Sequence, residues 1–80
     1  MKKFPYDIVV RGIHTWRLLN AYWTGPEGTD YGWHVALNTD SGQYGVLRIH
    51  NEDRFDWIVV DSENSARRFW QTALDMEIVK

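Results

Sequence analysis

The chain has 80 residues, no cysteine, a formal net charge of −2 and hydrophobic side chains at 44% of its positions. This composition excludes a disordered chain, a disulfide-stabilised fold and a zinc site built on thiolates. The slight acidity argues against a general nucleic-acid binder, which draws its affinity from basic groups that neutralise phosphates. We expect one small domain, residues 1–80, in which five tryptophans supply much of the buried area.

The N-terminal part of the chain contains one clear strand and one ambiguous segment. Residues 6–11 are rich in β-formers and alternate in polarity, which predicts a first strand ending at Gly12. Residues 13–23 fit either a strand or a helix capped by Thr15, and the β-formers at both ends favour the strand. No apolar run is long enough for a signal peptide or a membrane span, so we expect a complete cytoplasmic reading frame.

A loop and a hairpin follow. Residues 24–30 contain two glycines and a proline, which indicates a loop. A three-residue turn at Asp40-Ser41-Gly42, with Gly42 in the left-handed region, would pair Val35 with Leu47. That register places the following side chains on one apolar face: Trp33, Val35, Leu37, Leu47 and Ile49.

Residues 55–60 read as a further strand because aromatic and β-branched residues dominate the segment. A loop of residues 51–53 pairs His50 with Arg54. This pairing adds Phe55, Trp57 and Val59 to the same apolar face.

The C-terminal part predicts an amphipathic helix that starts at Asp61-Ser62-Glu63, where an oxygen side chain can cap the first turn. Its apolar stripe consists of Ala66, Phe69, Trp70, Ala73 and Leu74. We expect the stripe to cover the apolar sheet face, with Trp70 against Trp57 and Leu47. Residues 76–79 would form a short edge strand or a docked tail. The fold class is α+β: a small antiparallel meander of about four strands with the C-terminal helix packed on one face.

The other sheet face supplies the candidate binding site. Its members are His34, Tyr44, Val46, Arg48, Asp56 and Ile58, with Arg48 directly across from Asp56. The face is more apolar than a solvated surface requires, so either residues 13–23 cover it or it is an interface. As an interface, Val46 and Ile58 would supply desolvated area, while Tyr44 and Arg48 make anchoring contacts and Asp56 orients Arg48.

No motif indicates a cofactor, a metal or a catalytic centre. The histidines His14, His34 and His50 lack the spacing of a metal site. One face carries His34, Arg48 and Asp56, which are ingredients of a phosphodiester-cleaving site, but the basic substrate groove of an RNA-cleaving enzyme is missing. We therefore expect a protein without enzymatic activity, cofactor or metal.

These observations favour a small non-catalytic protein-binding module that associates with a protein partner or with itself. Its size and acidity suit an accessory protein, or an inhibitor of a host machine of the type that phage and mobile elements encode; this is an analogy at the level of fold and size. The alternative is a nucleic-acid-associated module that uses Arg17, Arg48 and exposed aromatic residues, and the third hypothesis is a small hydrolase or nuclease. A salt titration separates the first two, because phosphate neutralisation makes binding steeply salt-dependent.

Overall fold

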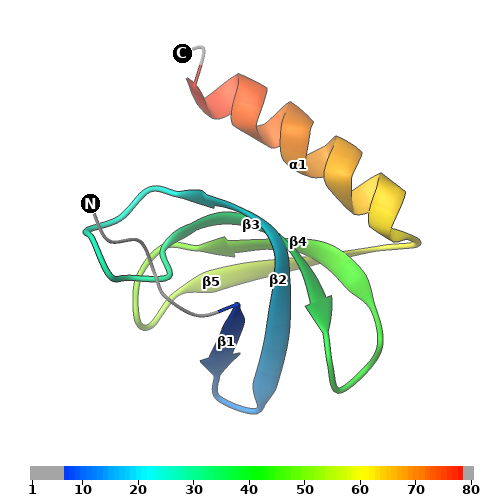
Figure 1. Cartoon of the computed structure of the whole chain (residues 1–80), viewed down its shortest axis with the longest axis horizontal. Coiled ribbons are helices and arrows are strands. Elements are labelled where there is room, and N and C mark those ends of the chain that lie inside the picture. Colours follow the sequence, from blue (N-terminus) through cyan, green and yellow to red (C-terminus); the bar gives the residue numbers. More distant parts are fainter. Residues whose placement is uncertain (1–6, 79–80) are drawn as a thin grey trace.

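A computed structural model of the chain describes residues 7–78 and shows an antiparallel five-stranded meander followed by one helix (Figure 1). The elements are β1 (Ile8–Arg11), β2 (His14–Trp23), β3 (Gly32–Asn38), β4 (Tyr44–Ile49), β5 (Phe55–Val60) and α1 (Glu63–Ile78). Strand order follows the sequence, so β1 and β5 form the two edges. The predicted α+β class is confirmed. The fifth strand arises because residues 14–23 form β2, a long strand between β1 and β3.

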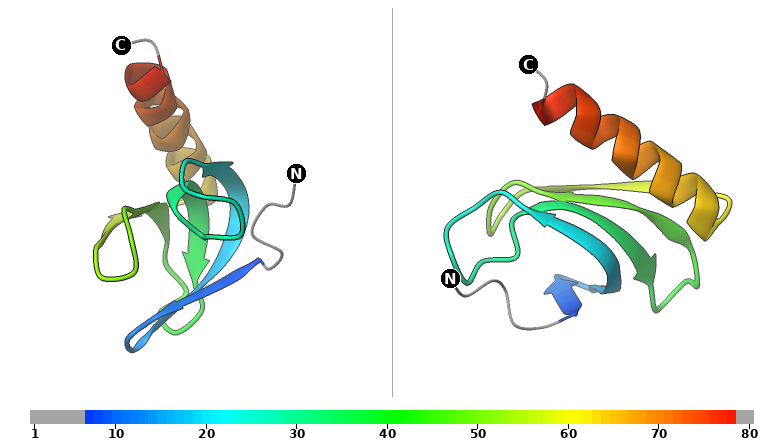
Figure 2. Two further views of the ribbon diagram at one scale, coloured as in Figure 1. Left: turned by 90° about the vertical axis from the view of Figure 1, so that its left-hand side faces the viewer. Right: turned by 45° about the horizontal axis from the view of Figure 1, so that its top comes forward.

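The sheet curves strongly, and Figure 2 shows its strands wrapping around one concave side. A two-residue turn at Gly12 and Ile13 joins β1 to β2, and a register shift between Leu18 and Asn20 interrupts the pairing of β2 with β3. Such a bulge bends its strand and increases the local twist. We call the concave side the inner face and the convex side the outer face.

The β3–β4 hairpin is one residue out of the predicted register, so that prediction is wrong. Val35 pairs with Val46 and Trp33 with Arg48. The turn has four residues, 39–42, because the backbone N–H of Asn38 donates to the backbone carbonyl of Gln43 at 2.9 Å. The Asn38 side-chain oxygen also accepts the amide hydrogens of residues 40 and 41, which favours the longer turn.

Gly42 has a φ of 75°, as the sequence predicts, but it closes the longer turn. The shift by one residue moves every β3 side chain to the face opposite the predicted one.

The inner face carries the hydrophobic core. Here the β4–β5 register is the predicted one: Leu47 pairs with Trp57, and the His50 amide donates to the Arg54 carbonyl at 3.0 Å. The buried cluster comprises Val9, Trp16, Ala36, Leu47 and Ile49, with Leu18, Tyr31, Phe55 and Trp57 packed against it. Residues from all five strands contribute, so the curved sheet covers its own inner face.

The helix lies on the outer face. Ser62 caps it by accepting the amide of Ser65 at 3.2 Å. The indole nitrogen of Trp70 donates to the carbonyl of Trp33 at 2.9 Å, and Val35 and Val46 are both fully buried. The predicted packing of Trp70 on Leu47 and Trp57 is therefore wrong. The changed register places Val35 beside Val46 on the outer face, while Trp16 of β2 packs in the core on the inner face.

The chain after Leu74 also differs from the prediction. Residues 76–78 continue α1 instead of forming a strand or a tail. Val79, which the prediction included, lies outside the described residues.

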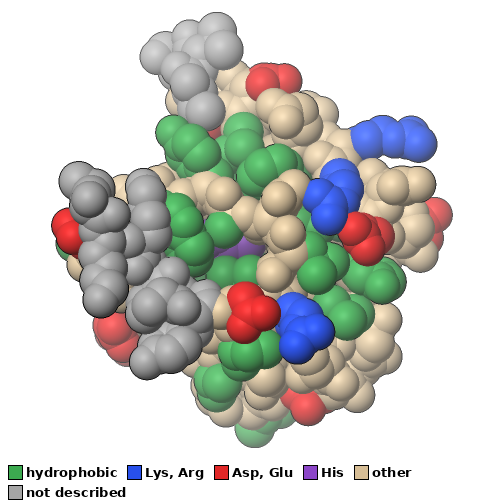
Figure 3. Space-filling view, viewed as in Figure 1, with side chains coloured by type: hydrophobic (Ala, Val, Ile, Leu, Met, Phe, Trp, Pro, Cys, Tyr) green, Lys and Arg blue, Asp and Glu red, His purple; other side chains and the backbone are tan. Residues whose placement is uncertain are grey.

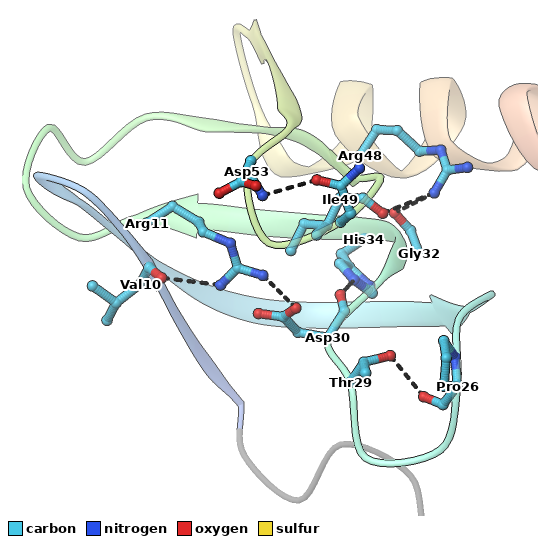
Figure 4. A network of polar contacts seen from close by, with 11 residues as sticks. Val10, Arg11, Pro26, Thr29, Asp30, Gly32, His34, Arg48, Ile49 and Asp53 are labelled. Carbon is cyan, nitrogen blue, oxygen red and sulfur yellow. Dashed lines mark hydrogen bonds and ion pairs between the residues drawn. The ribbon is translucent and has the colours of Figure 1, made fainter.

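The loop before β3 is held by a polar cluster (Figure 4). Arg11 on β1 forms an ion pair with Asp30 at 2.5 Å, and both side chains are largely shielded from solvent. The His34 Nε2 atom lies 2.8 Å from the Asp30 carbonyl oxygen, which can only accept, so Nε2 carries the hydrogen. These contacts fix the loop against β1 and set where β3 begins.

Candidate functional site

A groove opens between α1 and the outer face of the sheet. Figures 1 and 2 show the helix rising away from the strands toward its C-terminal end. The groove has a volume of about 670 Å³, and its lining residues are Trp33, Ile58, Ser65, Arg68, Phe69, Thr72, Ala73, Met76 and Glu77. Successive helical positions in this set are alternately three residues and one residue apart, so the seven positions form one face of α1. Trp33 and Ile58 form the floor from β3 and β5.

The apolar stripe of the helix is divided between the sheet and this groove. Ala66 and Leu74 are buried, whereas Phe69 is 41% exposed and Met76 is 65% exposed. Apolar side chains gather along the underside of the C-terminal half of α1 in the space-filling view (Figure 3). The helix therefore has more apolar surface than the sheet beneath it covers.

Arg48 lies beside the floor of the groove. Its guanidinium carbon is 5.3 Å from the centre of the Trp33 ring, which places the cation over the aromatic face. Its Nη1 atom donates to the carbonyls of Gly32 at 3.3 Å and Ile49 at 3.0 Å (Figure 4). These contacts hold a positive charge beside the apolar floor of the groove.

Asp56 does not orient Arg48 as predicted, although the two residues are paired in register. The Asp56 carboxylate instead lies 2.8 Å from the Nε2 atom of His50. Hydrogen bonding from His50 lowers the pKa of Asp56 below its usual value. Asp56 remains exposed, so it supplies a negative charge at the rim of the sheet.

The structure brings together only part of the predicted partner-binding set. Ile58 lines the groove, while Arg48 and Asp56 occupy the same outer face nearby. Val46 is fully buried beneath the helix. Tyr44, half-buried, pairs with Val60 at the end of β5 nearest the start of α1. The outer face is thus covered by α1. Residues 13–23, one of the two covers that the sequence allowed, instead pair with β3 within the sheet. A role in partner binding stays a prediction for the partner-binding set.

His34 is the one predicted site residue on the opposite face. It pairs with Leu47, is fully buried and contacts the Trp23 ring at a centroid distance of 4.8 Å. Burial lowers the pKa of His34 below its usual value, which favours the neutral imidazole. It therefore cannot join Arg48 and Asp56 in a shared site.

Sequence reasoning missed Trp33, Phe69, Ala73 and Met76 as groove residues. A signal for the helical members was present, because positions 69, 73 and 76 form their own row at spacings of four and three. That row lies beside the one formed by Ala66, Trp70 and Leu74. A stripe of two rows is wide enough to serve two surfaces.

The remaining observations concern other chemistries and known relatives. Within residues 7–78, no three His, Asp or Glu side chains are grouped closely enough to hold a metal ion. The described helix is 16 residues long, and no helix in this part of the chain could cross a membrane. Comparison with family models, curated proteins and solved structures finds no match for the chain.

Proposed function

We propose that this chain is a small non-catalytic protein-binding module, of the accessory or inhibitor type, that receives an apolar part of its partner in the groove. One observation carries the proposal: Phe69 and Met76 project into a hollow of about 670 Å³ whose floor is Trp33 and Ile58. Burying such side chains contributes about 25 cal/mol for each Å² removed from water. An open apolar groove along a helix is a common way to bind a peptide segment.

The polar groups around the groove support a protein partner. Arg68 and Glu77 line it with opposite charges, and Arg48 is fixed over Trp33 at one end. Protein interfaces combine an apolar centre with a polar rim, and their strongest contacts often involve tryptophan and arginine. A partner with one aliphatic or aromatic anchor and flanking charges matches this arrangement.

A selection from a random peptide display library tests the proposal. We expect selected peptides to share an apolar anchor and to bind a Phe69→Ser/Met76→Ser variant at least about tenfold more weakly. Both side chains are exposed, so the variant should keep its fold, which circular dichroism would verify. Gln71→Ser is the matched control, because Gln71 is exposed on α1 but does not line the groove.

Equal binding of the peptides to the wild type and the groove variant would contradict the proposal. So would an equal loss of binding in the Gln71→Ser control.

A further inference from the structure

The edge strand β5 is open to pairing. Among residues 7–78, β5 pairs only with β4, so the backbone groups along its other side have no strand partner. Edge strands in monomeric proteins are usually protected by short length, charged side chains, proline or a bulge. β5 has six residues, contains no proline and pairs with β4 without a register break, and its single charged residue is Asp56, near the start of the strand. The opposite edge, β1, has only four residues.

The charges at the two ends of β5 are complementary to a second copy in antiparallel orientation. Arg54 precedes the strand, Asp61 follows it, and both are exposed. When two such strands pair antiparallel about Ile58, each Arg54 lies opposite Ser62 of the other copy, one position from its Asp61, so an attraction between neighbouring positions occurs twice. A parallel pair would instead bring like charges together.

Exposed apolar residues flank the same edge. Of the six large hydrophobic side chains exposed in the described chain, Val59 lies on β5 and Phe69 and Met76 face the adjoining groove. A two-fold axis through this edge places both helices on the same side of the joined sheet, with their grooves facing the axis. Ile58 of each copy then contributes to a shared floor.

We infer that the partner of this surface is a second copy of the chain, with the two β5 strands paired antiparallel about a two-fold axis at Ile58. In this register each Trp57 lies opposite the other copy's Val59, an aromatic and β-branched pair that stabilises antiparallel sheets. A stable dimer buries about 800 Å² on each partner, which is about a sixth of the 5113 Å² exposed by one chain. The inference rests on the proposed function, because it names the partner of the same groove.

Sedimentation equilibrium of wild type and edge variants tests the inference. We expect the wild type to form dimers, and Val59→Lys to raise the dimer dissociation constant at least about tenfold. Val10→Lys is the matched control, because Val10 has a similar exposure, 56% against 45% for Val59, but lies on the other edge strand. The dimer dissociation constant of this variant should equal that of the wild type. A wild type that remains monomeric up to high concentration would overturn the inference, and so would equal dissociation of both variants.

Two further measurements test the orientation and the register. Arg54→Glu and Asp61→Arg should each weaken self-association, while an equimolar mixture of the two variants should associate more tightly than either alone. Because the chain has no cysteine, Ile58→Cys would form a disulfide across the proposed axis, whereas Val10→Cys would not. A mixture no tighter than its components refutes the antiparallel pairing, and a dimer that Ile58→Cys does not cross-link refutes the axis at Ile58.

The failure of this inference can be told apart from a failure of the proposed function. A monomeric protein removes the second copy as the partner. The display selection decides separately whether the groove binds a peptide anchor.

Discussion

Replacing Gly32 with alanine tests how closely β2 approaches the start of β3. Gly32 has a φ of 153° and pairs with Trp23, and a Cβ atom at this position would collide with the carbonyl oxygen of Tyr22. The same Cβ would lie 3.1 Å from the Cε1 atom of His34. Neither neighbour can move freely, because one is backbone and the other is a fully buried ring.

The expected loss follows from two contributions. An alanine forced into this backbone conformation costs about 1–3 kcal/mol. Displacing the end of β2 to relieve the collision weakens the last pairing with β3 and removes about 1 kcal/mol of hydrogen bonding. The sum is about 2–4 kcal/mol, a large part of the roughly 4–12 kcal/mol typical of a domain of 80 residues.

Gly42→Ala is the matched control, because Gly42 has a φ of 75° and nothing lies within 4 Å of its Cβ position. It should lose only the backbone contribution, about 1–2 kcal/mol. Urea unfolding, monitored by tryptophan fluorescence, measures the loss of unfolding free energy in both variants. The comparison requires that the dependence of this free energy on urea concentration is the same in both. If Gly32→Ala destabilises the protein no more than Gly42→Ala does, the close approach of β2 and β3 is wrong.

Three other predictions concern the helix and the buried histidine. Trp70→Phe should lower the free energy of unfolding by about 1 kcal/mol in a urea titration, because it removes the 2.9 Å hydrogen bond to the Trp33 carbonyl; an unchanged midpoint would argue against this contact. Ser62→Ala should cost about 1 kcal/mol by the same assay, since the helix loses its cap, and Ser41→Ala, in an exposed turn, should cost less. Burial lowers the pKa of His34 from its usual 6.5, so below that pH this histidine is protonated more readily in the unfolded chain than in the folded one. Thermal stability should therefore fall as the pH drops below about 6.5. His34→Gln should reduce that pH dependence, and a variant with the same slope as wild type would show that other groups cause it.

Local sequence signals determined the parts of the fold that depend on neighbouring residues. Ser62 begins the helix because its hydroxyl can accept an amide of the first turn. The loop of residues 51–53 sets the β4–β5 register, which the sequence predicts correctly. Positive φ at Gly42 likewise follows from the turn alone. In each case the deciding contacts lie within a few residues along the chain.

The β3–β4 register could not be read in the same way. Both faces of β3 and β4 carry apolar residues, so alternating polarity fits either register nearly as well. The Asn38 side chain decides the turn length through hydrogen bonds to residues 40 and 41. A shift of one residue then exchanges the two faces of β3.

Long-range packing settled which face became the core and where a groove remained. The sequence by itself determined the α+β class, the C-terminal helix and the order of the clear strands, but it left residues 13–23 open between a strand and a helix. Only the tertiary structure decided that β1 and β2 close the inner face around Trp16, which leaves the outer face to α1. The helix can cover that face with Ala66, Trp70 and Leu74, and Phe69 and Met76 are left facing the groove. The physical reason is competition: two apolar sheet faces were available to one helix, and the choice depended on contacts between residues far apart in the chain.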